Sequence, residues 1–279
     1  MSIRQTTPAK IKLASFAGLN YDENWTVKLS PKLTYHTIDL KTNLKNAKTI
    51  KKVRIDIGGT DVFTITGERL RQLNAIYQDF TQDGRFVLDM SNFRYRTPAG
   101  IYQTQLVTNI TDDVTLTVEF GARGTGDPEK LEMSGVAYAT DTDAVGRAFV
   151  PTKKEFTQMT ASAGEHSWLF PNGAPNKFIQ RMIFDENEVK ISKITVKRGG
   201  NTIHVFERDD LDFDLQRYAG AKLLPGICVL DFTAFGFGAN GATPSVGLEF
   251  VLDVDGKGSI KTYVEGYDQL KALRLPTAA

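Results

Sequence analysis

The sequence VRIDIGGTDV at residues 53–62 has a counterpart later in the chain, ITVKRGGNTI at residues 194–203. In both stretches apolar and polar residues alternate up to a Gly-Gly pair, and this alternation is typical of strands with one buried face. Glycine accepts the positive φ that a tight hairpin turn requires, so each stretch predicts a hairpin. The two Gly-Gly pairs begin at positions 58 and 199, about half the chain apart.

The repetition extends to both sides of the two hairpins. A tryptophan precedes each hairpin, Trp25 in the first half and Trp168 in the second. The segments that match after the hairpins are VLDM (87–90) with VLDF (229–232), and LTVEF (116–120) with VGLEF (246–250). A repeat of this length indicates a duplicated domain, because the repeats of solenoid proteins are much shorter.

Each hairpin leads into one amphipathic helical segment, at residues 67–79 and 208–219, and the rest of the apolar pattern has a period of two. The predicted strands of the first copy are 24–29, 33–40, 50–57, 61–66, 85–91, 101–107, 113–121 and 131–139. Those of the second copy are 165–170, 177–184, 189–198, 201–206, 226–235, a weak strand near 235–240, 245–253 and 259–267. Strands and helices do not alternate, so we expect an all-β fold of two tandem eight-stranded jelly rolls, a double jelly roll, each with one short inserted helix.

Composition suggests where the domains begin and end. Residues 1–20 lack periodicity and carry basic residues without an acidic one, so we expect an N-terminal arm. The first jelly roll is predicted at 21–140 and the second at 165–270. The segment between them, 141–164, is predicted to be an interdomain connection because it is rich in Thr, Asp, Ala and Ser. Residues 271–279 are predicted to form a C-terminal tail.

The charge balance and the cysteine count exclude several classes of protein. The 279 residues include 34 Lys and Arg against 33 Asp and Glu, so no polybasic surface is expected and no direct sequence-specific binding of nucleic acid. The single cysteine excludes an intramolecular disulfide framework and a four-cysteine zinc site. No apolar window reaches the length of a membrane span, and the start lacks the pattern of a signal peptide. We therefore expect a soluble chain, or one held at a membrane by its partners.

One glycine-rich motif resembles a nucleotide-binding fingerprint. Residues 236–241 read GFGANG, a G-x-G-x-x-G sequence. That fingerprint requires a helix directly after it, because the helix N-terminus holds the phosphate. Pro244 and an alternating strand pattern follow here, so we interpret the motif as a glycine-rich loop.

The histidines and the cysteine do not predict a catalytic centre. His36, His166 and His204 are far apart in the sequence, whereas a metal-dependent jelly-roll enzyme brings two or three histidines together. We expect surface or packing roles for all three. Cys228 lies in the apolar run ICVL and is expected to be an inert core residue.

Acidic residues crowd the start of the second predicted helix. Glu207 and the aspartates Asp209, Asp210, Asp212 and Asp214 lie where the helix dipole favours negative charge. One interpretation is charge capping of the helix. The other is that Asp209, Asp210, Asp212 and Asp214 are ligands of a calcium ion, which binds several carboxylate oxygens.

The chain resembles the double jelly-roll major capsid proteins of tailless icosahedral phages with an internal membrane, of the corticovirus type. The resemblance covers the element order from about residue 24 to 267, with TYHTIDL at 34–40, then IKKVRIDIGG at 50–59, then a Leu-rich helix. It implies a homotrimer with a pseudo-sixfold outline that stands upright in a shell over a membrane. It also implies calcium at the interfaces between capsomers, without identifying ligands.

We therefore expect a structural virion protein, a bacteriophage major capsid protein without enzymatic activity. Its expected partners are further copies of itself, minor capsid or vertex proteins, and the internal lipid membrane through the N-terminal arm. Assembly is expected in the cytoplasm of the host bacterium. Phe149, Phe156 and Trp168 are candidates to fill the subunit interface.

Two other classes of protein stay open at this point. A bicupin-like enzyme would have the same fold, but it would require a histidine cluster. A carbohydrate-binding double sandwich would present aromatic side chains in a groove, for which Phe93, Tyr95, Phe235 and Phe237 are candidates.

Overall fold

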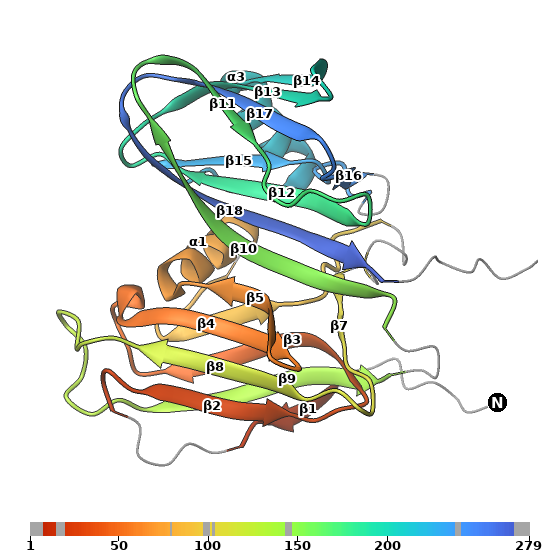
Figure 1. Ribbon diagram of the computed structural model, residues 1–279. Coiled ribbons are helices and arrows are strands. Elements are labelled where there is room, and N and C mark those ends of the chain that lie inside the picture. Colours follow the sequence, from red (N-terminus) through yellow and green to blue (C-terminus); the bar gives the residue numbers. More distant parts are fainter. Residues whose placement is uncertain are drawn as a thin grey trace, which may run out of the picture.

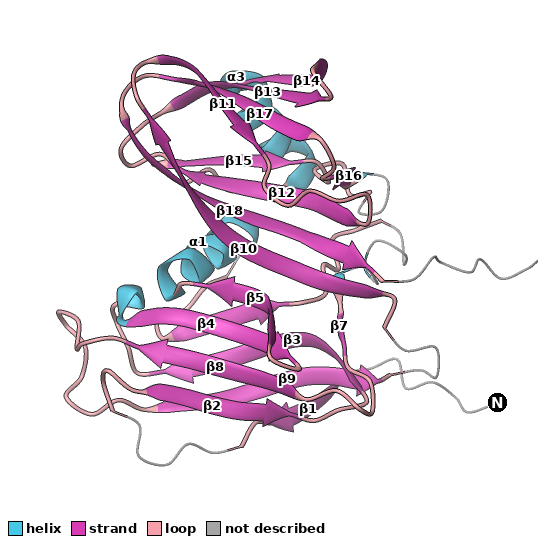
Figure 2. Ribbon diagram, viewed as in Figure 1, coloured by secondary structure: helices cyan, strands magenta, loops and turns pink. Residues whose placement is uncertain are grey.

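The computed structural model describes residues 8–14, 20–78, 80–96, 101, 104–142, 147–237 and 241–270. In Figure 1 two β-sandwiches lie one above the other, with the N-terminal half of the chain below. Figure 2 shows strands throughout, with short helices between the two sandwiches and beside the upper one.

The first sandwich is built from two sheets. One sheet has the strand order β1-β9-β3-β6, with β7 paired to β3, and the other contains β2-β8-β4-β5. Its strands are β1 (Ala9–Lys12), β2 (Asn24–Leu29), β3 (Leu33–Thr42), β4 (Ile50–Ile57), β5 (Thr60–Ile65), β6 (Arg85–Asp89), β7 (Leu106–Val107), β8 (Val114–Phe120) and β9 (Met133–Asp141).

The second sandwich repeats this arrangement. One sheet has the order β15-β12-β18-β10, with β16 paired to β12, and the other has the order β11-β17-β13-β14. Its strands are β10 (Phe149–Thr160), β11 (Gly164–Leu169), β12 (Lys177–Asp185), β13 (Ile191–Arg198), β14 (Asn201–Glu207), β15 (Ile227–Asp231), β16 (Thr243–Pro244), β17 (Leu248–Val254) and β18 (Gly258–Gln269).

Both sandwiches have the same topology. With the two-residue strands β7 and β16 left aside, the described residues form eight strands in each half, and the sheets have the orders 1-8-3-6 and 2-7-4-5 in both. Two four-stranded sheets of this kind are a jelly roll. The prediction of a double jelly roll is confirmed, and we call the halves the first roll and the second roll.

The paired hairpins are present as predicted. Gly58 and Gly59 have φ of 58° and 81°, and Gly199 and Gly200 have φ of 56° and 84°. Positive φ at both central residues is the requirement of a type I′ turn, which matches the twist of the flanking strands. The strand register shifts at equivalent places just before the two turns, between Ile55/Asp56 and between Val196/Lys197.

A helix follows each hairpin. In the first roll α1 (Gly67–Tyr77) starts after Thr66, whose side chain accepts a hydrogen bond from the backbone N–H of Arg69 at 3.2 Å. Gly67 lies so close to the segment before β4 that a Cβ would be 2.5 Å from the carbonyl oxygen of Ala47. In the second roll α3 (Arg208–Asp214) continues as the π-helix η2 (Leu215–Ala219) and ends at Gly220, which has a φ of 60°. A short 3-10 helix, η1 (Ala47–Thr49), precedes β4.

The structure corrects the strand count at the start of each roll. β1 lies within the expected arm 1–20, and β10 lies within the expected connection 141–164. Each is the first strand of its roll. β1 is only four residues long and mostly exposed, and the middle of β10 is polar, so neither carries the apolar alternation that marks a strand.

Two segments predicted as strands supply little pairing. Of 101–107, Leu106 and Val107 form β7. Of the weak strand near 235–240, residues 235–237 lie in a turn, and 238–240 lie outside the described residues. Counting these two segments as strands, in place of β1 and β10, gives the predicted eight strands in each roll.

Among the described residues one large hydrophobic cluster extends through both rolls, and a smaller one contains Phe149 and Tyr267. One cluster of buried side chains includes Ile55 and Leu88 of the first roll, Ile183 and Phe250 of the second, and Leu70 of α1. The rolls therefore share a core, in addition to the contact between strands β5 and β10.

Candidate functional site: the joint between the rolls

The two rolls meet where β5 of the first roll lies beside β10 of the second. The two strands are parallel, with Lys153 opposite Phe63, and they join one sheet of each roll into a nine-stranded sheet. The ammonium group of Lys153 lies 5.2 Å from the ring centroid of Phe63, within the range of a cation–π contact.

The helix α1 fills the angle between the rolls. Arg69 of this helix is 4% exposed, and its Nη2 lies 3.4 Å from Oδ2 of Asp185 in β12. At the other end of the helix, the Tyr77 hydroxyl donates a hydrogen bond of 3.2 Å to Asp231. The guanidinium group of Arg181 lies 3.9 Å from the centroid of the Tyr77 ring. The first roll therefore docks on the 1-8-3-6 sheet of the second roll through both ends of one helix.

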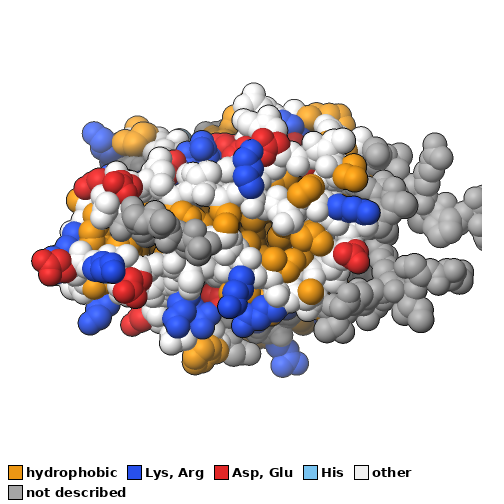
Figure 3. All heavy atoms as spheres, turned by 90° about the horizontal axis from the view of Figure 1, so that it is seen from below, with side chains coloured by type: hydrophobic (Ala, Val, Ile, Leu, Met, Phe, Trp, Pro, Cys, Tyr) orange, Lys and Arg blue, Asp and Glu red, His pale blue; other side chains and the backbone are white. Residues whose placement is uncertain are grey.

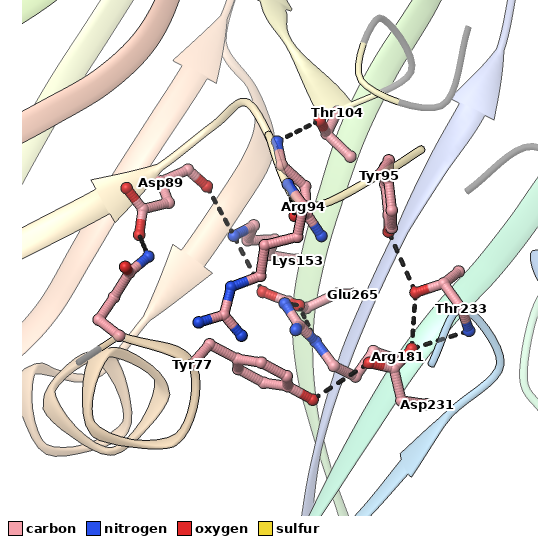
Figure 4. Close-up of polar contacts among 12 residues, drawn as sticks. Tyr77, Asp89, Arg94, Tyr95, Thr104, Lys153, Arg181, Asp231, Thr233 and Glu265 are labelled. Atoms are coloured by element: carbon pink, nitrogen blue, oxygen red, sulfur yellow. Dashed lines mark hydrogen bonds and ion pairs between the residues drawn. The ribbon is translucent and has the colours of Figure 1, made fainter. Parts of the chain in front are cut away.

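Glu265 is the centre of the charged groups at the joint (Figure 4). Arg181 donates to Oε2 of Glu265 through two nitrogens, and Nζ of Lys153 lies 2.9 Å from Oε1. Burial alone would raise the pKa of Glu265, but the two cations outweigh it and lower this pKa to about 2. Burial disfavours the charge of Arg181, yet Glu265 and other neighbours raise the pKa of Arg181 above its ordinary value. The cluster therefore stays ionised although it is buried.

A cavity of about 230 Å³ lies beside this cluster. It is lined by α1, the end of β6 and the second roll, and Asp89 is among its acidic residues. Burial raises the pKa of Asp89, whose side chain accepts a hydrogen bond of 2.9 Å from Gln78. The backbone carbonyl of Asp89 lies 3.4 Å from Nζ of Lys153. Lys153 of the second roll thus contacts Asp89 of the first roll at this cavity.

Loops from both rolls close the joint with direct hydrogen bonds. The backbone N–H of Arg96 donates to the carbonyl of Gly236 at 2.7 Å, and the hydroxyls of Tyr95 and Thr233 lie 3.2 Å apart. The backbone N–H of Lys222 donates to the carbonyl of Ile76 at 2.8 Å. The glycine-rich motif therefore begins in a loop that contacts the other roll, as a turn at Gly236 with a φ of 84°.

The acidic residues of the second helix do not come together as a metal site. Among the described residues no group of three His, Cys, Asp or Glu side chains is arranged to hold a metal ion. Asp212 accepts a hydrogen bond of 2.8 Å from Arg208, and Asp209 and Asp210 are exposed in the first turn of α3. Asp214 ends the same helix, and the N-cap residue Glu207 makes no side-chain capping bond.

The histidines lie in three unrelated places. His36 is buried and contacts Ser91 at 2.7 Å and Thr140 at 3.0 Å, and burial lowers its pKa. His166 lies in β11 and His204 in the exposed strand β14.

The predicted core role of the cysteine is confirmed. Cys228 is 1% exposed, and burial raises the pKa of its thiol.

The aromatic candidates have mixed positions. Phe93, Phe235 and Phe237 are exposed, but Tyr95 is buried at the joint, so the four do not form one binding groove. Of the expected interface residues, Phe149 is 3% exposed and packs edge-on against Tyr267. The partly buried Phe156 and Trp168 pack against each other and the main core. These three side chains therefore serve packing within the chain.

The residues that form the joint are not among the site residues predicted from the sequence. Arg181 lies in the run FIQRMIF and Glu265 in the run TYVEGY, so each is the one charged residue of a mostly apolar run. A lone charge in such a run is a signal of a buried ion pair, because a charge without a partner would not be stable there.

Two family models match consecutive parts of the chain. Residues 10–140 match the viral coat protein P2 N-terminal domain, and residues 150–270 match the viral coat protein P2 C-terminal domain. A search of curated proteins finds no match.

The chain is also similar to solved capsid structures. The major capsid protein P2 of bacteriophage PM2 is 16% identical, with a TM-score of 0.83 over 95% of this chain and 98% of that chain. A chain of the atomic structure of Sulfolobus turreted icosahedral virus is 11% identical, with a TM-score of 0.66 over 95% and 91%. A chain of the PBCV-1 virus capsid is 10% identical, with a TM-score of 0.63 over 96% and 95%. No comparison supports a carbohydrate-binding module or a bicupin. The chain therefore belongs to the viral coat protein P2 family and is a capsid protein with the double jelly-roll fold.

Proposed function

We propose that this capsid protein works as a homotrimer that tiles an icosahedral shell. The observation that carries the proposal is the joint between the rolls. It connects two units of the same topology head to tail, through an edge of one unit and the 1-8-3-6 sheet of the next.

Each chain has a second copy of each of the two strands that meet at this joint. β14 is the fifth strand of the second roll, as β5 is of the first, and it is the last strand of its sheet. β1 is the first strand of the first roll, as β10 is of the second, and it too lies at the end of its sheet. Figure 1 shows β14 at the top of the molecule and β1 at the bottom. A second copy placed above the first would bring β14 to a β1, as β5 is brought to β10.

The exposure of equivalent residues agrees with this arrangement. Val62 in β5 is 7% exposed, whereas its counterpart Ile203 in β14 is 38% exposed, and Val205 on the same strand is 54% exposed. An edge strand with exposed apolar side chains is prone to pair with another chain. At the opposite end, Figure 3 views the molecule from below, where a band of hydrophobic side chains crosses the face between charged groups.

A head-to-tail contact between identical copies closes into a ring when the rotation from one copy to the next is a whole fraction of a full turn. Three chains with two similar rolls each supply six similar units. Such a block packs on a hexagonal lattice, and this is the geometry that we assign to the shell.

The remaining partners follow from the same proposal. The N-terminal arm, residues 1–20, is proposed to contact an internal lipid membrane, since its basic residues Arg4, Lys10 and Lys12 are attracted to anionic lipid by about 1 kcal/mol per charge. No helix among the described residues is long and apolar enough to cross a membrane. Minor capsid or vertex proteins are proposed to bind the edges of the shell, with assembly in the host bacterial cytoplasm. We propose no catalytic step and no sequence-specific binding of nucleic acid.

Light scattering coupled to size exclusion tests the trimer. We expect a mass three times the chain mass of 30.9 kDa, unchanged on dilution to micromolar concentration because the interface is an obligate one. A folded monomer under these conditions, with β-sheet circular dichroism, would contradict the proposed function.

A further inference from the structure

We infer that the contact between copies contains an ion pair from Asp210 of one copy to Lys41 of the next, which is the charge-inverted equivalent of the Arg69–Asp185 pair within the chain. The inference rests on the proposed trimer and identifies the residues that set its contact. It follows from the internal duplication. Arg69 and Asp210 occupy one equivalent position in the two rolls, and Asp185 and Lys41 occupy another.

Arg69 and Asp210 occupy the same position in the two rolls. Each is the third residue of the helix that follows the hairpin, since α1 starts at Gly67 and α3 at Arg208. The preceding hairpins have matching registers, with Ile55 opposite Phe63 and Val196 opposite His204. Arg69 is buried against the other roll, whereas Asp210 is exposed.

Asp185 and Lys41 also occupy one position in the two rolls. In the second roll the ladder between β12 and β15 runs from Arg181–Asp231 to Asp185–Ile227. In the first roll the ladder between β3 and β6 runs from Thr37–Asp89 to Lys41–Arg85. Both ladders begin directly after an irregularity in the pairing with the strand on the other side. This irregularity lies between Ile179/Arg181, where β12 pairs with β18, and between Tyr35/Thr37, where β3 pairs with β9. The two registers therefore correspond residue by residue. Lys41 is exposed.

The charges at the four positions are complementary in both contacts. Within the chain Nη2 of Arg69 lies 3.4 Å from the carboxylate of Asp185, and the equivalent contact between copies would join Asp210 to Lys41. Both signs are exchanged, so the attraction is kept. The two mixed combinations, Arg69 with Lys41 and Asp210 with Asp185, would place like charges together.

The inversion gives the contact a specificity that one repeated pair would not give. When copies crowd together during assembly, α3 of a neighbour could compete with α1 for the 1-8-3-6 sheet of the second roll. Asp210 would then face Asp185, and repulsion between like charges in an interface disfavours the wrong partner. The inverted pair therefore directs α3 to the first roll of the next copy.

Charge reversals test the pair in the full-length protein. We expect Asp210→Lys and Lys41→Asp each to raise the dissociation constant of the trimer by about tenfold or more, because each places like charges together at the contact. The double variant Asp210→Lys/Lys41→Asp restores the attraction and should return the dissociation constant to near the wild-type value. The measurement is sedimentation equilibrium over a concentration series.

Matched controls separate this pair from a general effect of charge. Asp209→Lys makes the same change in the same helical turn, but its equivalent in the first roll, Glu68, stays exposed at the joint. Lys257→Asp makes the same change as Lys41→Asp in the exposed turn between β17 and β18. Both controls should dissociate like the wild type, and circular dichroism should find all variants folded.

The outcomes distinguish the inference from the proposed function. A trimeric wild type whose single variants dissociate no more than the controls would overturn the ion pair and leave the trimer intact. The pair would also be refuted by a double variant that is as weak as the single ones. A wild type that is monomeric would overturn the trimer and the pair together.

Discussion

At the joint, Glu265 accepts hydrogen bonds from Arg181 and pairs with Lys153, and all three belong to the second roll. Replacing Glu265 by Gln keeps the shape of the side chain but leaves two cations close together without their counter-charge. Breaking a buried pair in this way costs about 3–5 kcal/mol of unfolding free energy. Urea unfolding monitored by tryptophan fluorescence measures it. Glu155→Gln on the exposed side of β10 is the control and should cost less than about 0.5 kcal/mol.

The low pKa of Glu265 also predicts how stability depends on pH. The carboxyl has a pKa of about 2 in the folded chain against an ordinary value of 4.5. A lowered acid pKa adds stability above the unfolded value, and that stability is lost as the pH falls toward the folded value. The contribution is on the order of 3 kcal/mol and should disappear between about pH 4.5 and 2. If Glu265→Gln lost stability over this range as steeply as the wild type, another group would be responsible.

The acidic residues of α3 give a test of the calcium interpretation. Asp212 is engaged by Arg208, and Asp209, Asp210 and Asp214 form no group of three ligands with it. We expect EDTA to leave both the melting temperature and the native mass unchanged. If the melting temperature or the native mass fell in EDTA and added calcium restored it, the result would support a metal site completed by another copy. A ligand that binds only the folded state stabilises that state by mass action.

Among the elements, β1 is the one whose role differs most from expectation. It pairs with β9 from Ala9 to Lys12, and the backbone N–H of Leu13 donates to the carbonyl of Gly135 at 3.0 Å. Deleting residues 1–13 should therefore lower the unfolding free energy by about 2–3 kcal/mol, because two half-buried apolar side chains, Ile11 and Leu13, are lost. Deleting residues 1–7 should have little effect on the same unfolding curve.

The deletion of β1 has a second consequence that separates it from simple loss of burial. The edge of β9 would lose its partner, and an unpaired edge strand promotes aggregation. We expect the chain without residues 1–13 to fail in trimer formation as well. If it formed trimers as stable as those of the wild type, β1 would not be part of the contact between copies.

For the whole molecule, the shared core predicts cooperative unfolding. Tyr263 and Ile183 of the second roll are fully buried and belong to the same cluster as α1 of the first roll. Opening the joint would expose them, so neither roll should stay folded after the other unfolds. Differential scanning calorimetry should record one transition for the chain. Two separated transitions would mean that the rolls are independent and that the joint contributes little.

Local patterns along the chain are sufficient to predict the fold class and the duplication. The Gly-Gly turns and the alternation around them are local properties, because positive φ needs glycine and a half-buried strand needs a period of two. The helices after the hairpins and the core position of Cys228 follow from the same local patterns.

The strands that complete each roll, and the place where the rolls meet, depend on contacts between distant parts of the chain. β1 and β10 lie at sheet edges or between the rolls, where burial depends on a partner from elsewhere in the chain and leaves no alternation in the sequence. The ion pair of Arg181 with Glu265 joins residues that are far apart in the sequence, and so does that of Arg69 with Asp185. Spacing along the chain carries no information about such pairs, because folding alone brings their charges together.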